Sequence, residues 1–182
     1  YVSSPERQVT TNSEYSWNYP HGTYSMMSYT KAATILYTLM GIVGEETAND
    51  IFREYYRRWA FRHPSGKDFI NIVNEVVTKT HGDKYGSDMN WFFDQTLFGT
   101  GIVDYKVSGF SNVKLRDFKG IISEADSHRL VTNVTKDDSI YKSTVQLYRP
   151  GDVILPVDIM VHFDNGDTIM EAWDGKERFK DI

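Results

Sequence analysis

"WFFDQTLFGTGIVDYKV", residues 91–107, is the stretch of the sequence in which the hydrophobic period changes. Its first half carries large apolar residues at helical spacing and ends at Gly99 and Gly101, which are typical of positions where a helix stops. After Gly101 the chain takes on the two-residue alternation of half-buried strands. The stretch therefore predicts a boundary near residue 102, with a helical domain before it and a β domain after it.

Three more segments before this boundary have apolar residues at three- and four-residue steps, which indicates helices that share one core. Gly44 is typical of a stop between the first two, and Pro64 ends the second. Ser65 and Asp68 have the form of a capping box at the start of the third. The four expected helices span residues 32–43, 46–61, 65–81 and 88–98.

The second half of the chain predicts an antiparallel β domain. Residues 157–163 alternate apolar and polar side chains, and the tight-turn sequence Asp164-Asn165-Gly166 leads into a second run over 168–173, which is typical of a β-hairpin. At least five strands at this spacing favour a β-sandwich. The other strand candidates are residues 105–110, 129–134 and 142–148.

The predicted fold class is therefore α+β, with an N-terminal helical bundle followed by a separate antiparallel β-sandwich-like domain. Residues 1–101 form the helical domain, of which residues 1–28 are an irregular lead-in pinned by aromatic side chains. Residues 102–182 form the β domain. Because the sequence begins with Tyr1 rather than methionine, we expect it to be a piece of a longer protein.

The composition excludes several classes of protein. The net charge of -5 argues against a nucleic-acid partner, because proteins that bind the phosphate backbone concentrate Lys and Arg on one face. The absence of cysteine excludes disulfides, thiolate metal sites and a cysteine nucleophile. No window of the sequence approaches the roughly 18 apolar residues of a membrane span, so we expect none in this chain.

The histidines do not have the spacing of a hydrolytic zinc site, which usually includes two His residues one helical turn apart. No two of them are four positions apart, and none is followed by Glu. We therefore expect surface or hydrogen-bonded histidines and no metal site in this chain. Spacing alone does not exclude a Ser-His-Asp set, but no G-x-S-x-G motif is present. The histidines are His21, His63, His81, His128 and His162.

Three stretches, in order, resemble the M1 family of zinc aminopeptidases, the gluzincins. In that family a Tyr-x-Lys pair opens a helix after the metal-binding helices, a Trp-Phe-Phe-Asp-Gln helix leads through glycines into a β-sandwich, and core strands of the sandwich follow. The three stretches are SYTKAATILYTLMGIVGEETANDIFREYYRRWAFRHPSGKDF (28–69), MNWFFDQTLFGTGIVDYKV (89–107) and YRPGDVILPVDIMVHFDNGDTIMEAWDG (148–175).

The resemblance implies a fragment of a zinc-dependent enzyme that hydrolyses N-terminal residues of peptides. The fragment comprises the C-terminal part of the thermolysin-like catalytic domain and the start of the sandwich, which we expect to be truncated. The family's zinc ligands and general base belong to an H-E-x-x-H motif and a later Glu, and this chain begins downstream of them. We therefore expect zinc only in the intact parent, no activity of this chain alone, and a missing N-terminal metal-binding subdomain as its partner. A smaller departure is Thr96, where many relatives carry Trp.

The resemblance assigns the catalytic role in this chain to Tyr29. The tyrosine of the Tyr-x-Lys motif faces the substrate carbonyl, where a protonated phenol can stabilise the negative charge that forms on oxygen. Tyr24 matches a second tyrosine that lines the same substrate pocket. Without the resemblance, both residues are interpreted as packing tyrosines at the start of a helix. We expect Lys31 to be a solvated or carboxylate-paired residue rather than a base.

Two other functions stay open. A noncatalytic protein-interaction scaffold derived from the same fold differs from the enzyme only in residues upstream of Tyr1. A carbohydrate-binding sandwich is weakly supported, because Trp173 is the single Trp of the β half. In the fragment interpretation, the surfaces that the missing parts would cover are exposed, so we expect possible self-association. The localisation is open, and a parent in the bacterial cell envelope or secreted is one expectation.

Overall fold

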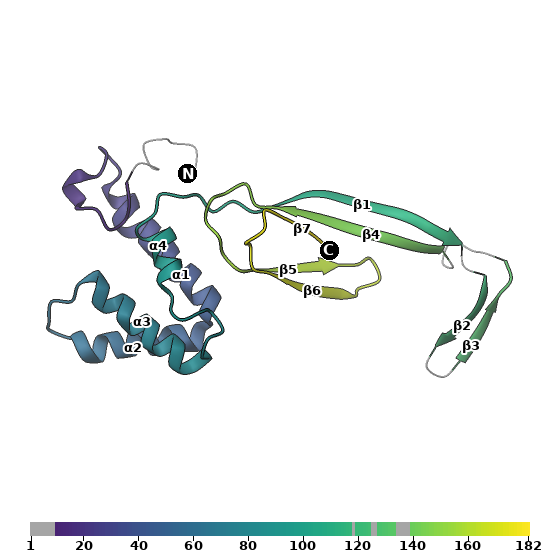
Figure 1. The fold of residues 1–182 in the computed structure, drawn as a ribbon, viewed down its shortest axis with the longest axis horizontal. Coiled ribbons are helices and arrows are strands. Elements are labelled where there is room, and N and C mark those ends of the chain that lie inside the picture. Colours follow the sequence, from purple (N-terminus) through teal and green to yellow (C-terminus); the bar gives the residue numbers. More distant parts are fainter. Residues whose placement is uncertain (1–9, 118, 125–126, 134–138) are drawn as a thin grey trace. The chain divides into compact units, whose positions relative to one another are not determined.

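The computed structural model of the chain describes residues 10–117, 119–124, 127–133 and 139–182, which leaves Val134, the end of an expected strand, outside the described residues. The chain forms two compact units. One contains the helices and the other the strands, and the helices precede the strands along the chain (Figure 1). The predicted α+β class is confirmed.

The helical unit contains the four helices expected from the sequence. Their limits differ from the expected ones by a few residues at most, because caps and glycines fix the ends. A π-helix leads directly into α1 and begins inside the segment that the sequence analysis interpreted as irregular, which corrects the lead-in of residues 1–28. The helices are η2 (Ser16–Asn18), η3 (Met26–Lys31), α1 (Ala32–Val43), α2 (Glu45–Trp59), α3 (Gly66–His81) and α4 (Asn90–Thr96).

Two sequence signals act as expected at the helix ends. Gly44 has φ 87°, a conformation that side-chain-bearing residues rarely adopt, and it alone joins α1 to α2. Its N–H donates to Met40 O at 2.9 Å, and its carbonyl accepts from Ala48 N–H at 3.0 Å. At the start of α3, Asp68 Oδ2 accepts hydrogen bonds from the N–H and the hydroxyl of Ser65, at 2.7 and 2.6 Å. This contact is the capping box.

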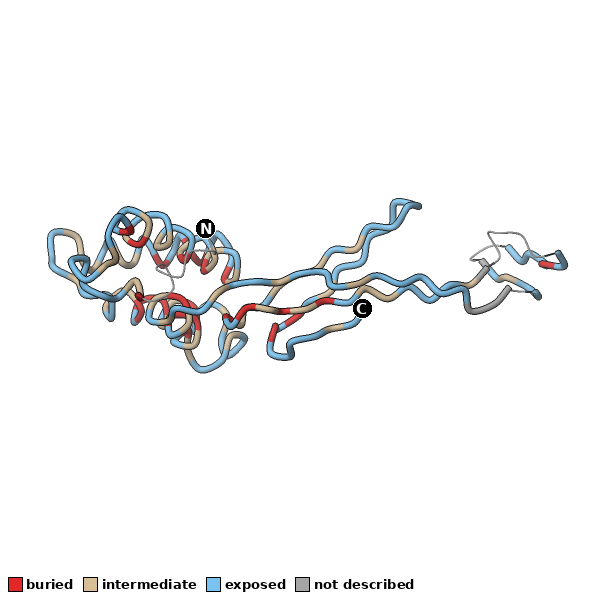
Figure 2. Tube along the Cα trace, turned by 90° about the horizontal axis from the view of Figure 1, so that it is seen from above, coloured by how far each residue is buried: buried red, intermediate tan, exposed pale blue. Residues whose placement is uncertain are grey.

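The core of the helical unit contains apolar side chains from all four α-helices. Ile51, Val73 and Phe92 have no exposed surface, and Figure 2 shows buried positions concentrated in this unit. The aromatic residues of α4 belong to this core: Phe92 and Phe93 are buried and meet edge to face, with ring centroids 5.3 Å apart, and Trp91 packs against the core partly buried. Burial of rings in this way removes large apolar areas from water and is the main stabilising term for these helices.

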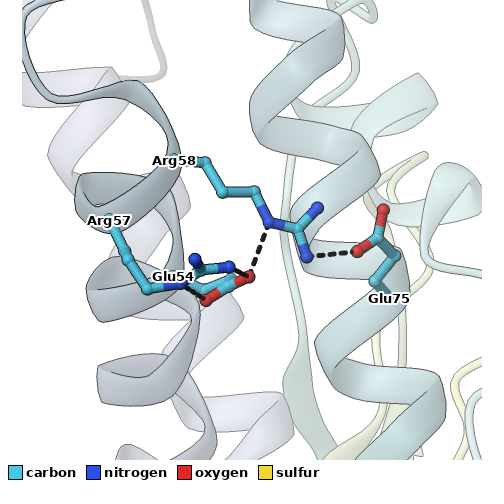
Figure 3. A network of polar contacts seen from close by, with 4 residues as sticks. All are labelled: Glu54, Arg57, Arg58 and Glu75. Atoms are coloured by element: carbon cyan, nitrogen blue, oxygen red, sulfur yellow. Dashed lines mark hydrogen bonds and ion pairs between the residues drawn. The ribbon is translucent and has the colours of Figure 1, made fainter.

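An ion-pair network joins α2 to α3 on the outside of this core (Figure 3). Arg58 donates to Glu54 on its own helix at 2.5 Å and to Glu75 on α3 at 2.6 Å. Arg57 binds the same Glu54 carboxylate with two hydrogen bonds of 2.7 Å. These hydrogen bonds, first from Arg57 and then from Arg58, lower the pKa of Glu54 to about 2. The basic residues at the end of α2 therefore pair with carboxylates.

A return segment, residues 151–156, belongs to the helical unit although the sequence placed all of 102–182 in the β domain. Gln95 of α4 holds it: Gln95 Oε1 accepts from Ile154 N–H at 2.7 Å, and Nε2 donates to Ile154 O at 3.3 Å. Val153 N–H also donates to Ile102 O at 3.2 Å. Gly101 permits this close approach, because a Cβ there would lie 3.0 Å from a methyl group of Val153.

The β unit consists of antiparallel strands in three sheets. β4 lies between β1 and β7 in a three-stranded sheet, β2 pairs with β3, and β5 pairs with β6. Figure 1 shows the long β1–β4 pair and the β5–β6 hairpin. A sandwich of two packed sheets stays a prediction. The strands are β1 (Lys106–Asp117), β2 (Gly120–Glu124), β3 (Ser127–Val131), β4 (Ser139–Tyr148), β5 (Val157–His162), β6 (Thr168–Trp173) and β7 (Phe179–Asp181).

The expected hairpin is present, with His162 opposite Thr168. Its turn is closed by two hydrogen bonds, from Phe163 N–H to Asp167 O at 2.9 Å and from Gly166 N–H to Phe163 O at 3.0 Å. β1 extends seven residues beyond the expected 105–110, and β2 and β7 were not expected. Both strands are short, so their own sequences carry too little alternation to predict them without knowledge of the strands that they pair with.

A buried arginine fixes the end of β4 within the β unit. Arg149 is 4% exposed, and its Nε donates to Gly175 O at 2.8 Å, just after β6. Arg178 in turn donates to Arg149 O at 3.3 Å. Buried charge is tolerated only where hydrogen bonds replace its hydration, so these contacts hold the segment after β6 against β4. In the part of the chain that is described, no helix is both long enough and apolar enough to cross a membrane.

Candidate functional site

The segment that carries Tyr24 and Tyr29 is held in place by polar contacts and one buried methionine. Thr23 lies at the helical start: its hydroxyl donates to Pro20 O at 2.7 Å, and its carbonyl accepts from Met27 N–H at 2.9 Å. Met27 is 1% exposed, and its carbonyl accepts from Asn12 Nδ2 at 2.7 Å. The start of η3 is therefore anchored on one face.

Tyr29 lies in the middle of this π-helix, on its exposed side. Its side chain is 66% exposed, and among the described residues no group forms a hydrogen bond with its hydroxyl. π-Helices are rare and frequently occur at functional sites, because the extra residue in the turn redirects the side chains around it. Tyr29 is thus a phenol donor available to a molecule outside the helical unit.

Tyr24 is brought next to Tyr29. The two rings meet edge to face with centroids 6.3 Å apart, and Tyr24 is 50% exposed. On its other side Tyr24 contacts the ring of Tyr19 at 6.4 Å. Tyr19 is fixed in turn, because its hydroxyl donates to Asn12 O at 3.2 Å. The three tyrosines form a continuous row, here called the tyrosine row, that ends at the free hydroxyl of Tyr29.

Sequence reasoning selected Tyr24 and Tyr29 but missed Tyr19. The signal that could have found it is spacing, since the three tyrosines are five positions apart. A second exposed aromatic pair lies in the same lead-in: the rings of Tyr15 and Trp17 stack at 4.5 Å, and Trp17 is 76% exposed. The lead-in therefore displays aromatic side chains instead of burying them all.

Lys31 follows Tyr29 in the same helix start. It forms no ion pair or hydrogen bond with another described residue and is half-buried, and this burial lowers the pKa of its amine. It faces an apolar pocket that Thr96 also lines. No carboxylate pairs with Lys31 among the described residues, and the lysine lies at the start of α1 beside the apolar residues of this pocket.

Three of the five histidines have hydrogen-bond partners among the described residues. His81 Nε2 lies 2.9 Å from Thr47 Oγ1 and 3.1 Å from Val43 O, where the first three α-helices meet. His128 contacts Ser123, and His162 contacts Thr168. Across residues 10–117, 119–124, 127–133 and 139–182, no three His, Asp or Glu side chains gather in a way that could hold a metal ion.

Comparisons with models of protein families, with curated proteins and with solved structures find no match to this chain. The resemblance to zinc aminopeptidases therefore stays a prediction from the sequence. The candidate site is defined by its geometry alone: a tyrosine row, one free phenol at its end, and a helix start that holds both.

Proposed function

We propose that this chain is the C-terminal part of the catalytic domain, together with a β domain, of a zinc-dependent aminopeptidase that hydrolyses N-terminal residues of peptides. Its resemblance to the M1 family supplies the reaction class. The observation that carries the proposal is the hydroxyl of Tyr29, which is exposed and free of partners among the described residues, at the one helix start that matches the family's Tyr-x-Lys motif.

Tyr29 acts as a hydrogen-bond donor to the carbonyl oxygen of the scissile bond. When the carbonyl carbon is attacked, negative charge develops on this oxygen, and a neutral phenol placed beside it stabilises the charge. Because the hydroxyl of Tyr29 has no partner among the described residues, it donates without breaking a contact with any of them. One donor of this kind typically contributes about 3 to 4 kcal/mol to transition-state stabilisation.

Tyr24 and Tyr19 orient this donor. An edge-to-face ring contact is worth about 0.5 to 1.5 kcal/mol, which is enough to favour one ring orientation over others. The sequence contains no H-E-x-x-H motif, so the proposal, which rests on the family resemblance, assigns metal binding to residues outside this chain. Peptide substrate and that metal-binding part are its proposed partners.

Zinc titration and a reconstitution assay test this proposal. We expect the chain alone to bind no zinc stoichiometrically and to release no N-terminal residue from an aminoacyl amide. Activity should appear when the chain is produced together with the residues encoded upstream of Tyr1. One tight zinc site in the chain alone, or upstream residues that lack H-E-x-x-H, would contradict the proposal. The second result would favour the noncatalytic scaffold.

A further inference from the structure

The helical unit contains a pocket that the proposed function does not use. Its volume is about 270 Å³, and it lies between the start of α1, the end of α4 and the return segment 151–156. Neither Tyr24 nor Tyr29 lines it. The wall is mostly apolar, and its hydrophobic members are Met26, Met27, Ile35, Ile102, Val103, Val153 and Leu155.

Among the residues that the structure describes, one charged group lies in this wall. Lys31 is the single ionisable residue among those that line the pocket, and its amine has no partner among the described residues. Four threonines and Gln95 supply the remaining polar surface, but Gln95 is already bonded to Ile154, and the Thr96 hydroxyl donates to the carbonyl of Phe92 at 2.7 Å. The pocket therefore offers an apolar lining and one free cation.

We propose that this pocket binds a small apolar monocarboxylate, with the carboxylate at Lys31 Nζ and the hydrocarbon chain against Ile35, Ile102 and Leu155. A half-buried ammonium needs an anion to replace the hydration it has lost, and the lining favours a partner whose other end is apolar. At roughly 30 Å³ for each water-sized group, the volume accepts about nine non-hydrogen atoms. Octanoate, which has about ten non-hydrogen atoms, is therefore a probe of matching size.

The rigid frame of the pocket supports a preformed site. Gln95 binds Ile154, and the carbonyl of Ile102 accepts from Val153 N–H, so Val153 and Leu155 are held in the wall. Met27 and Ile35 are 1% and 7% exposed and belong to the anchored face of the helix start. A preformed apolar pocket with a few convergent polar groups is the usual architecture of a small-molecule site.

Titration of the chain with a head-group series tests the proposal. Octanoate, octanol and octylammonium share the same hydrocarbon tail, and binding is followed by calorimetry and by NMR shifts of the Ile and Leu methyl groups. We expect one molecule of octanoate per chain, weaker binding of octanol, and no binding of octylammonium. Equal affinity for octanoate and octanol, or no binding of either, would overturn the proposal.

Two variants separate the charge from the cavity. Lys31→Met keeps an apolar stem but removes the charge. It should lower the affinity for octanoate about tenfold, as expected for one charge-assisted contact, and leave the affinity for octanol unchanged. Lys67→Met, at an exposed lysine of α3, is the control and should leave the affinities for octanoate and octanol unchanged.

Thr38→Trp tests the cavity, because the new ring fills the pocket from the half-buried surface of α1. It should abolish binding of octanoate and of octanol, while the far-UV circular dichroism spectrum is preserved. Unchanged octanoate affinity in Lys31→Met would reject the site.

Light scattering in the same samples tests whether a second copy of the chain, rather than a small molecule, occupies the pocket. If a second copy of the chain covered the pocket, octanoate would fail to bind to the associated species, and dilution would restore binding together with a monomer mass. That outcome would overturn the ligand proposal. We expect instead that octanoate binds equally at low and high protein concentration.

Discussion

The ring of Tyr24 meets the ring of Tyr29 edge to face, with 6.3 Å between their centroids. Both side chains are at least half exposed, so the contact orients them without burying them. The hydroxyl of Tyr29 has no hydrogen-bond partner among the described residues. A phenol whose ring is oriented and whose hydroxyl is not bound within the described chain is suited to donate to a bound molecule, and this relationship is the physical basis of the proposed function.

Gln95→Ala should loosen the return segment from the helical unit. The side chain makes two hydrogen bonds to Ile154 and a third to Trp91 O at 2.9 Å, and its loss leaves the Ile154 N–H without its acceptor. We expect a loss of about 1 to 3 kcal/mol in the free energy of unfolding, measured by urea denaturation. Asn49→Ala, at an exposed helix position, is the control. Equal stability of the two variants would show that Gln95 is not a clamp.

The ion-pair network around Glu54 should make the helical unit sensitive to acid. The pKa of Glu54 is lowered to about 2 from 4.5, so its contribution to stability is complete above pH 4.5 and is lost as the pH falls from 4.5 towards 2. We expect the urea midpoint to fall less over this range in Glu54→Gln than in the unaltered chain. High salt should reduce the difference, because solvent reaches the network. Parallel pH curves of the two proteins would argue against this contribution.

Phe61→Gly should stabilise the helical unit although it removes an aromatic ring. Arg62 N–H donates to Trp59 O at 2.9 Å, which closes a turn whose third residue, Phe61, has φ 62°. A residue with a side chain costs about 1 to 2 kcal/mol in this conformation, and glycine removes this cost. Glycine also loses more backbone entropy on folding, which offsets about 0.5 to 1 kcal/mol of the gain. The ring is fully exposed and contributes no burial.

Phe61→Ala is the matched control, since it removes the ring but keeps a Cβ at positive φ. We expect its melting temperature to stay near that of the unaltered chain, while that of Phe61→Gly rises. If both variants lose stability equally, the ring rather than the backbone determines the effect.

The β unit should promote self-association. β1 pairs with β4 on one side only within the described sheets, and Val107, Phe110 and Val113 along it are between 55% and 67% exposed. An exposed strand edge with apolar side chains is a template for pairing with another chain. We expect the mass from light scattering to rise with concentration, and Val113→Lys to reduce the rise. A monomer at all concentrations would contradict this prediction.

Local signals in the sequence predicted most of the helical unit. The glycine at position 44 and the capping box at Ser65 set helix limits through backbone conformation and hydrogen bonds to near neighbours, so periodicity and caps were sufficient. The β5–β6 hairpin followed for the same reason, since its turn residues are adjacent in the sequence. Tyr24 was expected near the site, and it contacts Tyr29.

Features that depend on distant residues were not predictable. The hydrogen bonds between Gln95 and Ile154 join positions 59 residues apart, and the short strand β7 exists only because β4 lies beside it. The pocket beside Lys31 was not predictable either, because the return segment supplies Val153 and Leu155 to its wall. Helical period alone also did not indicate a π-helix at residues 26–31.

The central claim is that the hydroxyl of Tyr29 stabilises charge on the substrate carbonyl. The kcat of Tyr29→Phe, which lacks only this hydroxyl, tests the claim most directly. The assay uses the chain together with its upstream residues and follows release of the N-terminal residue from an aminoacyl amide. Tyr37→Phe, an exposed tyrosine of α1, is the control. The account predicts that Tyr29→Phe lowers kcat by about 100- to 1000-fold with little change in KM, while Tyr37→Phe keeps full activity. A Tyr29→Phe enzyme with undiminished kcat would contradict it.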